Sequence, residues 1–355
     1  MNVYASAYGI TKFRKDNTSI YSLALESAID LIKRFDIDKD SIDGVIIATS
    51  SIEPYIASIV SEMLGIKPKI AHKLEQMCSS GSSAIAAAYS YIYSGICKNV
   101  LVIGVDKHDT IGKRLDWDNS RGEFKHPAHW AALYAKMHMK AFNTTEEQLA
   151  LVTVKNRDNA INNKYAYFQE RITIDEVLNS KIVVDPIKLY ECSYPCDGSA
   201  AILLSNKPSE NSIKVTGIGE QSLGASISSI TDFTSIESTR LAAKEAYDMA
   251  GIDASKVDIA EVHDAFTICE ILAYEDLGFT ERGKGGKFIE NIDKIGIKIN
   301  TRGGLLGTGH PVGATGIAQA AEIIRQLMLG YRIGLIHNMA AAGTTSNVII
   351  MENEI

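Results

Sequence analysis

Residues 303–316 read GGLLGTGHPVGATG and are the most informative segment of the chain. Six of its fourteen residues are glycine, and an apolar helical pattern follows without a break. A flexible linker would not lead straight into such a helix, so the glycines predict a tight loop in which another part of the backbone approaches closely. His310 stands within this loop and is a candidate for chemistry. The alternative is an incidental histidine in a glycine-rich turn.

A second stretch, residues 75–84 with the sequence EQMCSSGSSA, matches the first. Residues 78–81 align with residues 310–313 at an offset of 232, and both stretches enter helices rich in Ala and Ile. Residues 37–43 also match residues 252–258, at an offset of 215. The repeat predicts two copies of one unit related by a pseudo-twofold axis, with His310 at the position equivalent to Cys78.

Apolar strand patterns alternate with amphipathic helical patterns in both copies. Such alternation is typical of βαβ units, so we expect an α/β fold whose sheets are covered by helices on both faces. We expect a first half at residues 1–205 and a second half at residues 206–355. Residues 115–194 have no counterpart in the second half, and we interpret them as an insertion of loops and helices. An insertion beside the central loops is a candidate for shaping a substrate tunnel.

Cys78 lies between a strand-like start and a helix made of Ser, Gly and Ala. Taken alone, a cysteine is more often a small core residue. At a helix N-terminus, however, free N–H groups and the helix dipole favour an anion, which predicts a lowered thiol pKa and a nucleophile. His310, facing it from the second copy, would be the base that activates the thiol.

Two further loops carry candidate groups. His263, at the end of an apolar strand, could donate a hydrogen bond to a carbonyl oxygen, although a single histidine at a strand end is more often structural. The small residues Ala341, Ala342 and Gly343 would let backbone N–H groups reach a thioester oxygen.

Composition excludes several classes of protein. The apolar fraction is 46%, the charged fraction is 22%, and the net charge is −7 with both signs interspersed. No basic stripe suggests nucleic-acid binding, and no apolar run is long enough to span a membrane. The first residues show no secretory signal, so we expect a cytoplasmic protein. The five cysteines are an odd number, which predicts thiols; we expect Cys192 and Cys196 to pack and no metal site to form.

Together these loops resemble the thiolase family, and most closely the archaeal acetoacetyl-CoA thiolases and the sterol-carrier-protein type. The resemblance extends into the insertion, at residues 154–157 and 162–165. It implies the thiolase fold, with two duplicated βαβαβαββ halves in five layers (αβαβα). It also implies a homodimer or tetramer and a tunnel for the pantetheine arm of coenzyme A, with no cofactor other than coenzyme A thioesters.

The resemblance also implies roles for residues. Cys78 would be acylated and His310 would activate it, while His263 would help to form an oxyanion site for the second substrate. The backbone of Cys78 and the turn at residues 341–343 would form the other oxyanion site. The remaining residues expected to border the substrate are Gly309, Pro311, Asn338 and Phe266.

Thiolases commonly carry a second cysteine as the acid/base of condensation, and this chain departs from that pattern. At the two positions where that cysteine is found in the family, this chain has Asn338 and Ala265. Residues 340–342, where the family commonly has glycines, are alanine. Cys269 is the tempting substitute, but its place on an apolar helix face predicts a structural thiol. Acylation of the thiol is therefore better supported than carbon–carbon bond formation, and the acid/base could be His310, His263 or water.

The resemblance favours an acetyl-CoA C-acetyltransferase that condenses two acetyl-CoA molecules and feeds the mevalonate pathway. Its expected partners are a hydroxymethylglutaryl-CoA synthase and an OB-fold acyl-CoA-binding protein with a zinc ribbon. The alternatives are a degradative 3-ketoacyl-CoA thiolase and a thiolase-fold scaffold that binds acyl-CoA without condensing it. The Gly-His-Pro loop argues against an enzyme like a ketoacyl-ACP synthase.

Overall fold

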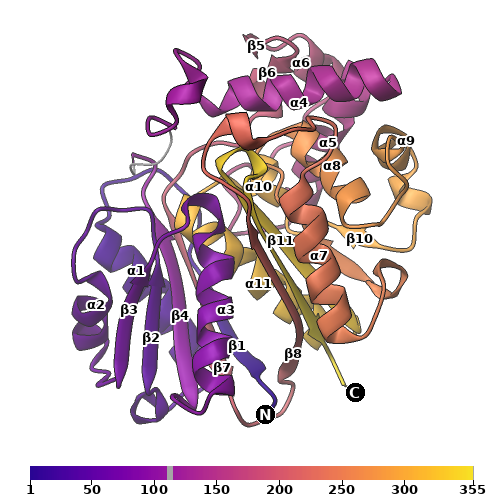
Figure 1. Cartoon of the computed structure of the whole chain (residues 1–355). Coiled ribbons are helices and arrows are strands. Elements are labelled where there is room, and N and C mark those ends of the chain that lie inside the picture. Colours follow the sequence, from indigo (N-terminus) through magenta and orange to yellow (C-terminus); the bar gives the residue numbers. More distant parts are fainter. Residues whose placement is uncertain (110–114, 355) are drawn as a thin grey trace.

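The computed structural model describes residues 1–109 and 115–354. Two α/β halves lie side by side, the first in indigo and purple and the second in orange and yellow, with a group of helices above both (Figure 1). None of the helices in the described residues has the length and apolar character needed to cross a bilayer.

Ten strands form one continuous sheet in which each half repeats the same order. In the first half the order is β3-β2-β4-β7-β1, and in the second it is β10-β9-β11-β12-β8. In each half the first strand pairs with the last, β1 with β7 and β8 with β12. The halves meet where β1 pairs with β8. This identical order confirms the predicted duplication. The first-half strands are β1 (Tyr4–Ile10), β2 (Gly44–Ala48), β3 (Ile70–Leu74), β4 (Asn99–Asp106) and β7 (Gly198–Ser205). Those of the second half are β8 (Ile213–Ser222), β9 (Ile259–Glu261), β10 (Lys298–Ile299), β11 (Ile333–Ala340) and β12 (Thr345–Glu352).

Each half of the sheet counts as one layer. Helices lie between the two halves and on the outer face of each, which gives five layers. The outer helices of the first half are α1 (Ile20–Arg34) and α2 (Ile56–Leu64), and those of the second are α7 (Glu237–Ala250) and α8 (Thr267–Asp276). The central helices α3 (Ser80–Tyr93) and α11 (Thr315–Met328) contact strands of both halves. All five residues of β2 are buried, because helices cover both of its faces, and this explains its continuous apolar sequence.

The two central helices approach each other very closely. A Cβ atom added to Gly81 would lie 2.8 Å from the Ile317 nitrogen and 3.0 Å from the Gly316 Cα. Both distances are shorter than an ordinary van der Waals contact, so only a residue without a side chain fits there. The small residues of both helices are therefore a packing requirement of the central layer.

The loops that carry Cys78 and His310 correspond at a different offset from the one expected. The short helical turns η2 (Met77–Ser79) and η8 (Val312–Ala314) precede α3 and α11, and both pairs of elements are offset by 235 residues. Cys78 is therefore equivalent to Gly313, and the alignment of Cys78 with His310 was wrong by three residues. The glycines of both loops allow either alignment, and the helix boundaries decide between them.

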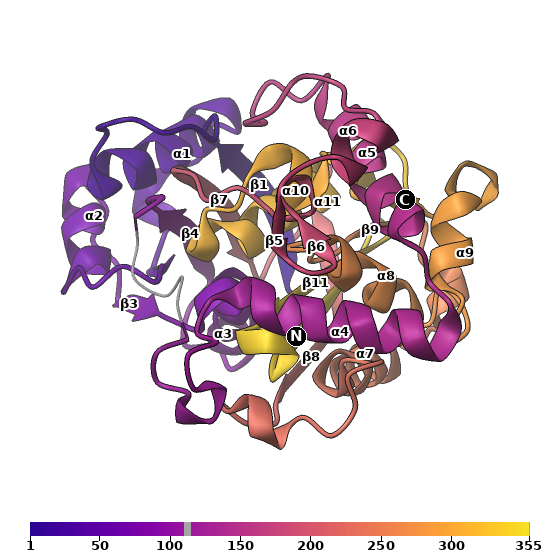
Figure 2. The same cartoon turned by 90° about the horizontal axis from the view of Figure 1, so that it is seen from above.

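Between β4 and β7 the chain leaves the sheet and forms the upper group of helices. This segment holds α4 (Pro127–Phe142), α5 (Glu146–Ala160), α6 (Ile174–Leu178) and the hairpin of β5 (Ile182–Val184) and β6 (Ile187–Lys188). The equivalent strands β11 and β12 are joined only by the turn η9 (Ala341–Gly343). From above, α4 passes over α3 and reaches the second half (Figure 2).

The second half carries an addition that was not expected, with α9 (Gly285–Glu290) and α10 (Gly304–Thr308) between α8 and η8. The remaining short helical turns are η1 (Lys39–Ser41), η3 (Asn119–Arg121), η4 (Leu189–Glu191), η5 (Ile227–Ser229), η6 (Ala254–Lys256) and η7 (Ile292–Lys294).

Gly81→Ala should destabilise the protein by about 1–3 kcal/mol, the usual cost of forcing a group into a packed core. Chemical denaturation followed by circular dichroism measures this change. Gly296→Ala is the matched control, since nothing lies within 4 Å of an added Cβ there. Equal stability of the two variants would show that the contact between α3 and α11 is looser than described.

Candidate active site

The three residues expected to carry the chemistry come together. The thiol of Cys78 and a ring nitrogen each of His263 and His310 all lie within 4.8 Å of one another. The Cys78 Sγ is 3.3 Å from His310 Nε2, and the two imidazole rings meet edge to face with centroids 5.4 Å apart. The first half thus supplies the thiol, and the second half supplies both imidazoles.

Cys78 lies on η2, in the short turn that joins β3 to α3. Met77, the residue before it, has a φ of 51°, a left-handed conformation that is unusual for a residue with a side chain. Ser80 stabilises the turn, because its hydroxyl accepts from the Gln76 amide and donates to the Met77 carbonyl. The turn that carries the Cys78 thiol is therefore strained at the residue before it.

The surroundings of His310 determine which of its nitrogens carries the proton. The Thr315 hydroxyl has one proton, which it donates to the Pro311 carbonyl at 3.1 Å. In its 2.7 Å contact with His310 Nδ1 this hydroxyl must then be the acceptor, so the imidazole proton is on Nδ1. The lone pair of Nε2 consequently faces the Cys78 thiol. Sequence reasoning did not assign this role to Thr315.

The resting pair is uncharged. Burial, with the charges of Asp106 and Glu75, raises the pKa of the Cys78 thiol to about 12. Burial, with the charge of Arg302, lowers the pKa of His310 to about 3. The expectation of a lowered thiol pKa was wrong, because loss of water outweighs the effect of the helix end. Attack by this sulfur on a substrate would therefore require a proton transfer from the thiol.

His263 follows β9 and is almost completely buried, with 1% of its surface exposed. Its amide N–H donates to His337 Nδ1 at 3.4 Å, so the proton of His337 is on Nε2, which contacts the Thr239 hydroxyl at 3.0 Å. Burial lowers the pKa values of both His263 and His337, so both rings are neutral. His263 can therefore donate one hydrogen bond to a carbonyl oxygen without carrying a charge.

Hydroxyl groups continue this chain to the turn at residues 341–343. Each has a single proton, and the last donates to a carbonyl, so the direction of every hydrogen bond is set. The chain runs from Thr239 through Ser346 and Ser238 to the Gly343 carbonyl, with contacts of 2.9, 2.7 and 2.6 Å. These hydrogen bonds connect the His263 loop to the turn at residues 341–343. No sequence motif predicted them.

Asp264, the neighbour of His263, positions the loop that carries His310. Its buried carboxylate accepts from the amides of Leu305 and Leu306 at 2.7 and 3.1 Å, at the start of α10. It also accepts from the Asn156 side chain on α5 at 2.7 Å. Arg157, the next residue, donates to the Leu306 carbonyl at 3.0 Å. Residues 156 and 157, within the insertion segment that resembles the thiolases, therefore hold the loop that carries His310.

The turn at residues 341–343 has an unusual backbone. Ala341 and Ala342 have φ values of 51° and 68°, a conformation that costs a residue with a side chain roughly 1–2 kcal/mol. The Tyr134 hydroxyl of α4 helps to hold it by donating to the Ala342 carbonyl at 3.2 Å. Ala341 and Met77 line one cavity of about 430 Å³, so the turn and the Cys78 loop face the same space. The role of the turn as an oxyanion site stays a prediction.

The other residues expected at the substrate have different surroundings. The Asn338 carboxamide is fully buried; it accepts from Ser82 and donates to Gln319 and the His337 carbonyl, so both of its amide protons are already used. It therefore joins α3, α11 and β11 and has no amide proton left to donate to substrate. The Phe266 ring packs edge to face on Trp130 of α4, with centroids 5.2 Å apart.

Gly309 and Pro311 flank His310 in the second loop. The Gly309 amide donates to the Leu305 carbonyl at 2.9 Å, and the Pro311 carbonyl is the acceptor for Thr315. Both residues thus shape the loop that holds the imidazole, and their contact with substrate stays a prediction.

A second thiol does not join the cluster. Cys269 is completely buried on α8, and burial raises its pKa far above the ordinary value. Its fully buried position agrees with the expected structural role. Among the described cysteines, only Cys78 lies within 4.8 Å of both imidazoles.

Comparison with known proteins matches each half of the chain to a thiolase domain model. One family model, "Thiolase, N-terminal domain", matches residues 4–207, and another, "Thiolase C-terminal domain-like", matches residues 219–353. The chain is 32% identical to an acetyl-CoA acetyltransferase of Methanothermobacter thermautotrophicus, with 94% of each chain covered. It is also 32% identical to the benzoylsuccinyl-CoA thiolase subunit BbsB of Thauera aromatica, covering 97% of this chain and 94% of that protein.

Solved structures share the fold. An Ltp2–ChsH2(DUF35) aldolase superposes with a TM-score of 0.88 at 22% identity, covering 99% of this chain and 98% of that chain. An acetyl-CoA acetyltransferase from Syntrophomonas wolfei superposes with a TM-score of 0.77 at 18% identity, covering 99% of both chains. These likenesses confirm the predicted fold class.

The neutral Cys78–His310 pair predicts how alkylation by iodoacetamide depends on pH. Because the raised thiol pKa leaves Cys78 protonated at neutral pH, the reactive thiolate should increase about tenfold per pH unit between pH 6 and 9. Stopped-flow or mass-spectrometric rates measure this, with Cys78→Ser as the control for labelling at other cysteines. A rate that levels off above about pH 7 would instead show a preformed thiolate–imidazolium pair.

Proposed function

This chain belongs to the thiolase family, and we propose that it is an acetoacetyl-CoA thiolase that condenses two acetyl-CoA molecules through an acyl-Cys78 intermediate. Its family and its acetyl-CoA acetyltransferase relatives make it an acyltransferase that uses coenzyme A thioesters without a further cofactor. The observation that carries the proposal is the 3.3 Å contact between the Cys78 thiol and His310 Nε2.

In the first half-reaction, Cys78 attacks the thioester carbonyl while its proton passes to His310 Nε2. The new C–S bond forms an oxyanion, for which the backbone N–H groups at Cys78 and the turn at residues 341–343 are the proposed donors. When the oxyanion collapses, the coenzyme A sulfur leaves and takes the proton back from His310. Thr315 keeps the Nδ1 proton in place throughout.

In the second half-reaction, a second acetyl-CoA loses an α-proton, and the resulting carbanion attacks the acyl group on Cys78. We assign His263 as a donor to the enolate oxygen, because its ring is neutral and lies beside His310. The Cys78 sulfur leaves, and acetoacetyl-CoA forms. His310, His263 or a bound water moves the protons in place of the second cysteine.

We place this activity in the cytoplasm, at the start of the mevalonate pathway, in a homodimer or tetramer. The archaeal acetyl-CoA acetyltransferases of similar sequence support the acetyl transfer itself. The proposed partners are a hydroxymethylglutaryl-CoA synthase and an OB-fold zinc-ribbon protein that binds acyl-CoA. The structural neighbour named Ltp2–ChsH2(DUF35) joins two components, which supports a partner for this chain.

Three observations favour a second candidate function. Asn338 has no free amide proton, Ala265 has no acid/base, and Cys269 is completely buried. A scaffold that accepts an acyl group without condensing it needs none of these groups. Measurement of acetoacetyl-CoA formation and cleavage, with and without the proposed partners, separates this possibility and a degradative thiolase from the synthetic enzyme.

Cys78 should become acylated when the protein is mixed with acetyl-CoA. Mass spectrometry should find one acetyl group on the peptide that holds Cys78, and His310→Ala should slow its formation about a hundredfold or more, the usual effect of losing a positioned base. Cys97→Ser is a control thiol outside the site. Acetylation that persists on another cysteine in Cys78→Ser would refute the assignment.

His263→Ala should separate the two half-reactions. Because His263 is assigned to the enolate oxygen, acylation of Cys78 should stay within a few-fold of the native rate, while condensation falls by about a hundredfold. Single-turnover acylation and steady-state condensation, measured on one preparation, give both rates. If acylation falls as far as condensation, His263 serves the nucleophile or the fold.

A further inference from the structure

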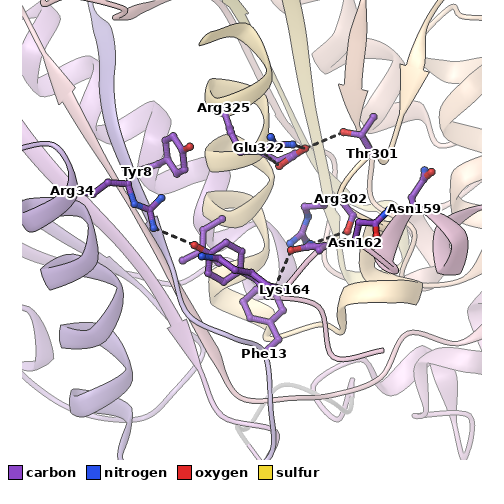
Figure 3. Close-up of a pocket in the computed structure, with 13 residues that line it drawn as sticks. Tyr8, Phe13, Arg34, Asn159, Asn162, Lys164, Thr301, Arg302, Glu322 and Arg325 are labelled. Carbon is purple, nitrogen blue, oxygen red and sulfur yellow. Dashed lines mark hydrogen bonds and ion pairs between the residues drawn. The ribbon is translucent and has the colours of Figure 1, made fainter. Parts of the chain in front are cut away.

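A second cavity, of about 460 Å³, lies where the first half, the second half and the insertion meet. Figure 3 shows side chains from β1, α1, α11 and the loop after α5 converging on it. None of Cys78, His263 and His310 lines this cavity, so it is separate from the catalytic cluster. Its size falls in the range of pockets that hold small molecules.

Positive charge dominates the lining. Arg34, Lys164, Arg302 and Arg325 border the cavity, whereas Glu322 is the single carboxylate among the described lining residues. Two of these cations already have carboxylate partners: Arg34 pairs with Asp30, and Arg325 pairs with Glu322 at 2.8 Å. Lys164 lies over the ring of Tyr165, 4.9 Å from its centroid.

Arg302 is the unusual member of this group. Only 5% of it is exposed, and its Nε lies 3.3 Å from Glu261 Oε2. Its Nη2 is buried and has no hydrogen-bond partner in the described part of the chain. A buried guanidinium N–H without an acceptor is costly, and native proteins normally satisfy such a group. The missing acceptor would be supplied by an anion in the cavity that Arg302 lines.

The charge of Arg302 is also incompletely neutralised by its partner. Glu261 is fully buried, and burial raises the pKa of its carboxyl to about 8. A carboxyl that keeps its proton near neutral pH leaves the guanidinium charge to be balanced by another group. This adds to the geometric argument for a bound anion.

The remaining walls are suited to the body of an organic molecule. Tyr8, Ile10, Phe13 and Tyr165 supply aromatic and aliphatic surface beside the cations. Such a combination, with a few placed polar groups among apolar side chains, is typical of small-molecule sites.

We propose that this cavity binds a small organic anion, whose phosphate or carboxylate group contacts Arg302 and Lys164 and whose body lies against Tyr8 and Phe13. Guanidinium groups bind both anions through charge-assisted hydrogen bonds. The ligand would lie beside Arg302, immediately before the glycine stretch that carries His310. The site goes beyond the proposed function and does not depend on it.

Isothermal titration calorimetry of the full chain with inorganic phosphate, and separately with acetate, at constant ionic strength tests the proposal. Native protein should bind at least one of the two anions, and the tighter one identifies the preferred group. Arg302→Gln should weaken that binding by about ten- to a hundredfold and Lys164→Gln by a few-fold. Lys256→Gln, an exposed lysine that does not line the cavity, should bind like native protein.

Three outcomes would overturn the proposal. They are the absence of binding of either anion at about 10 mM, unchanged affinity in Arg302→Gln and Lys164→Gln, and complete displacement of the anion by coenzyme A, which would place it in the substrate site. Circular dichroism checks that Arg302→Gln is folded. If it is not, the exposed Lys164→Gln variant decides the question. Cys78 acylation is measured separately, so failure of this site leaves the proposed function untouched.

Discussion

The buried carboxylate of Asp264 is the contact on which the active site depends. It accepts hydrogen bonds from two amides at the start of α10 and from Asn156 on α5, and it adjoins His263 in the chain. One side chain thus connects the strand-end loop, the glycine loop and the insertion. Because α10 leads directly to His310, the position of the base relative to the thiol follows from this carboxylate. Rigid placement of this kind allows a weakly basic imidazole to act at a fixed distance.

The site works without standing charges at the reacting atoms. Burial leaves the thiol protonated and the imidazoles neutral, so the site does not have to stabilise an isolated ion before substrate arrives. In the proposed mechanism, charge develops only when the sulfur attacks, and the proposed backbone N–H donors would stabilise it. Among the described residues no second thiol joins the cluster, so the site holds a single buried thiol. The two histidines differ in their partners: the Thr315 hydroxyl contacts the His310 ring at Nδ1, whereas His263 contacts His337 through its backbone amide.

Much of the fold followed from the sequence, because the two glycine loops and the repeated segments report local structure. They predicted two similar α/β halves and the meeting of Cys78 with His310, and the family resemblance added His263 to the site. The offset of the loops was mistaken because glycine and small residues fit several alignments, and only helix boundaries distinguish them. The thiol pKa was mistaken because burial arises from packing between halves, which a local motif does not contain. The chain of Thr239, Ser346 and Ser238 was invisible for the same reason, since those residues meet only after α7 and β12 pack together.

The contact between Gly81 and Gly316 has a consequence for the ancestry of the molecule. The two residues occupy equivalent positions in the two copies and touch each other across the pseudo-twofold axis. In a symmetric ancestor made of two identical chains, they would have been a single residue meeting its own copy. A side chain added at this residue would then have appeared on both helices and clashed from both sides of the contact. The two halves now differ, since one bears the thiol and the other both imidazoles, but at this point each half still limits which residue the other can accept.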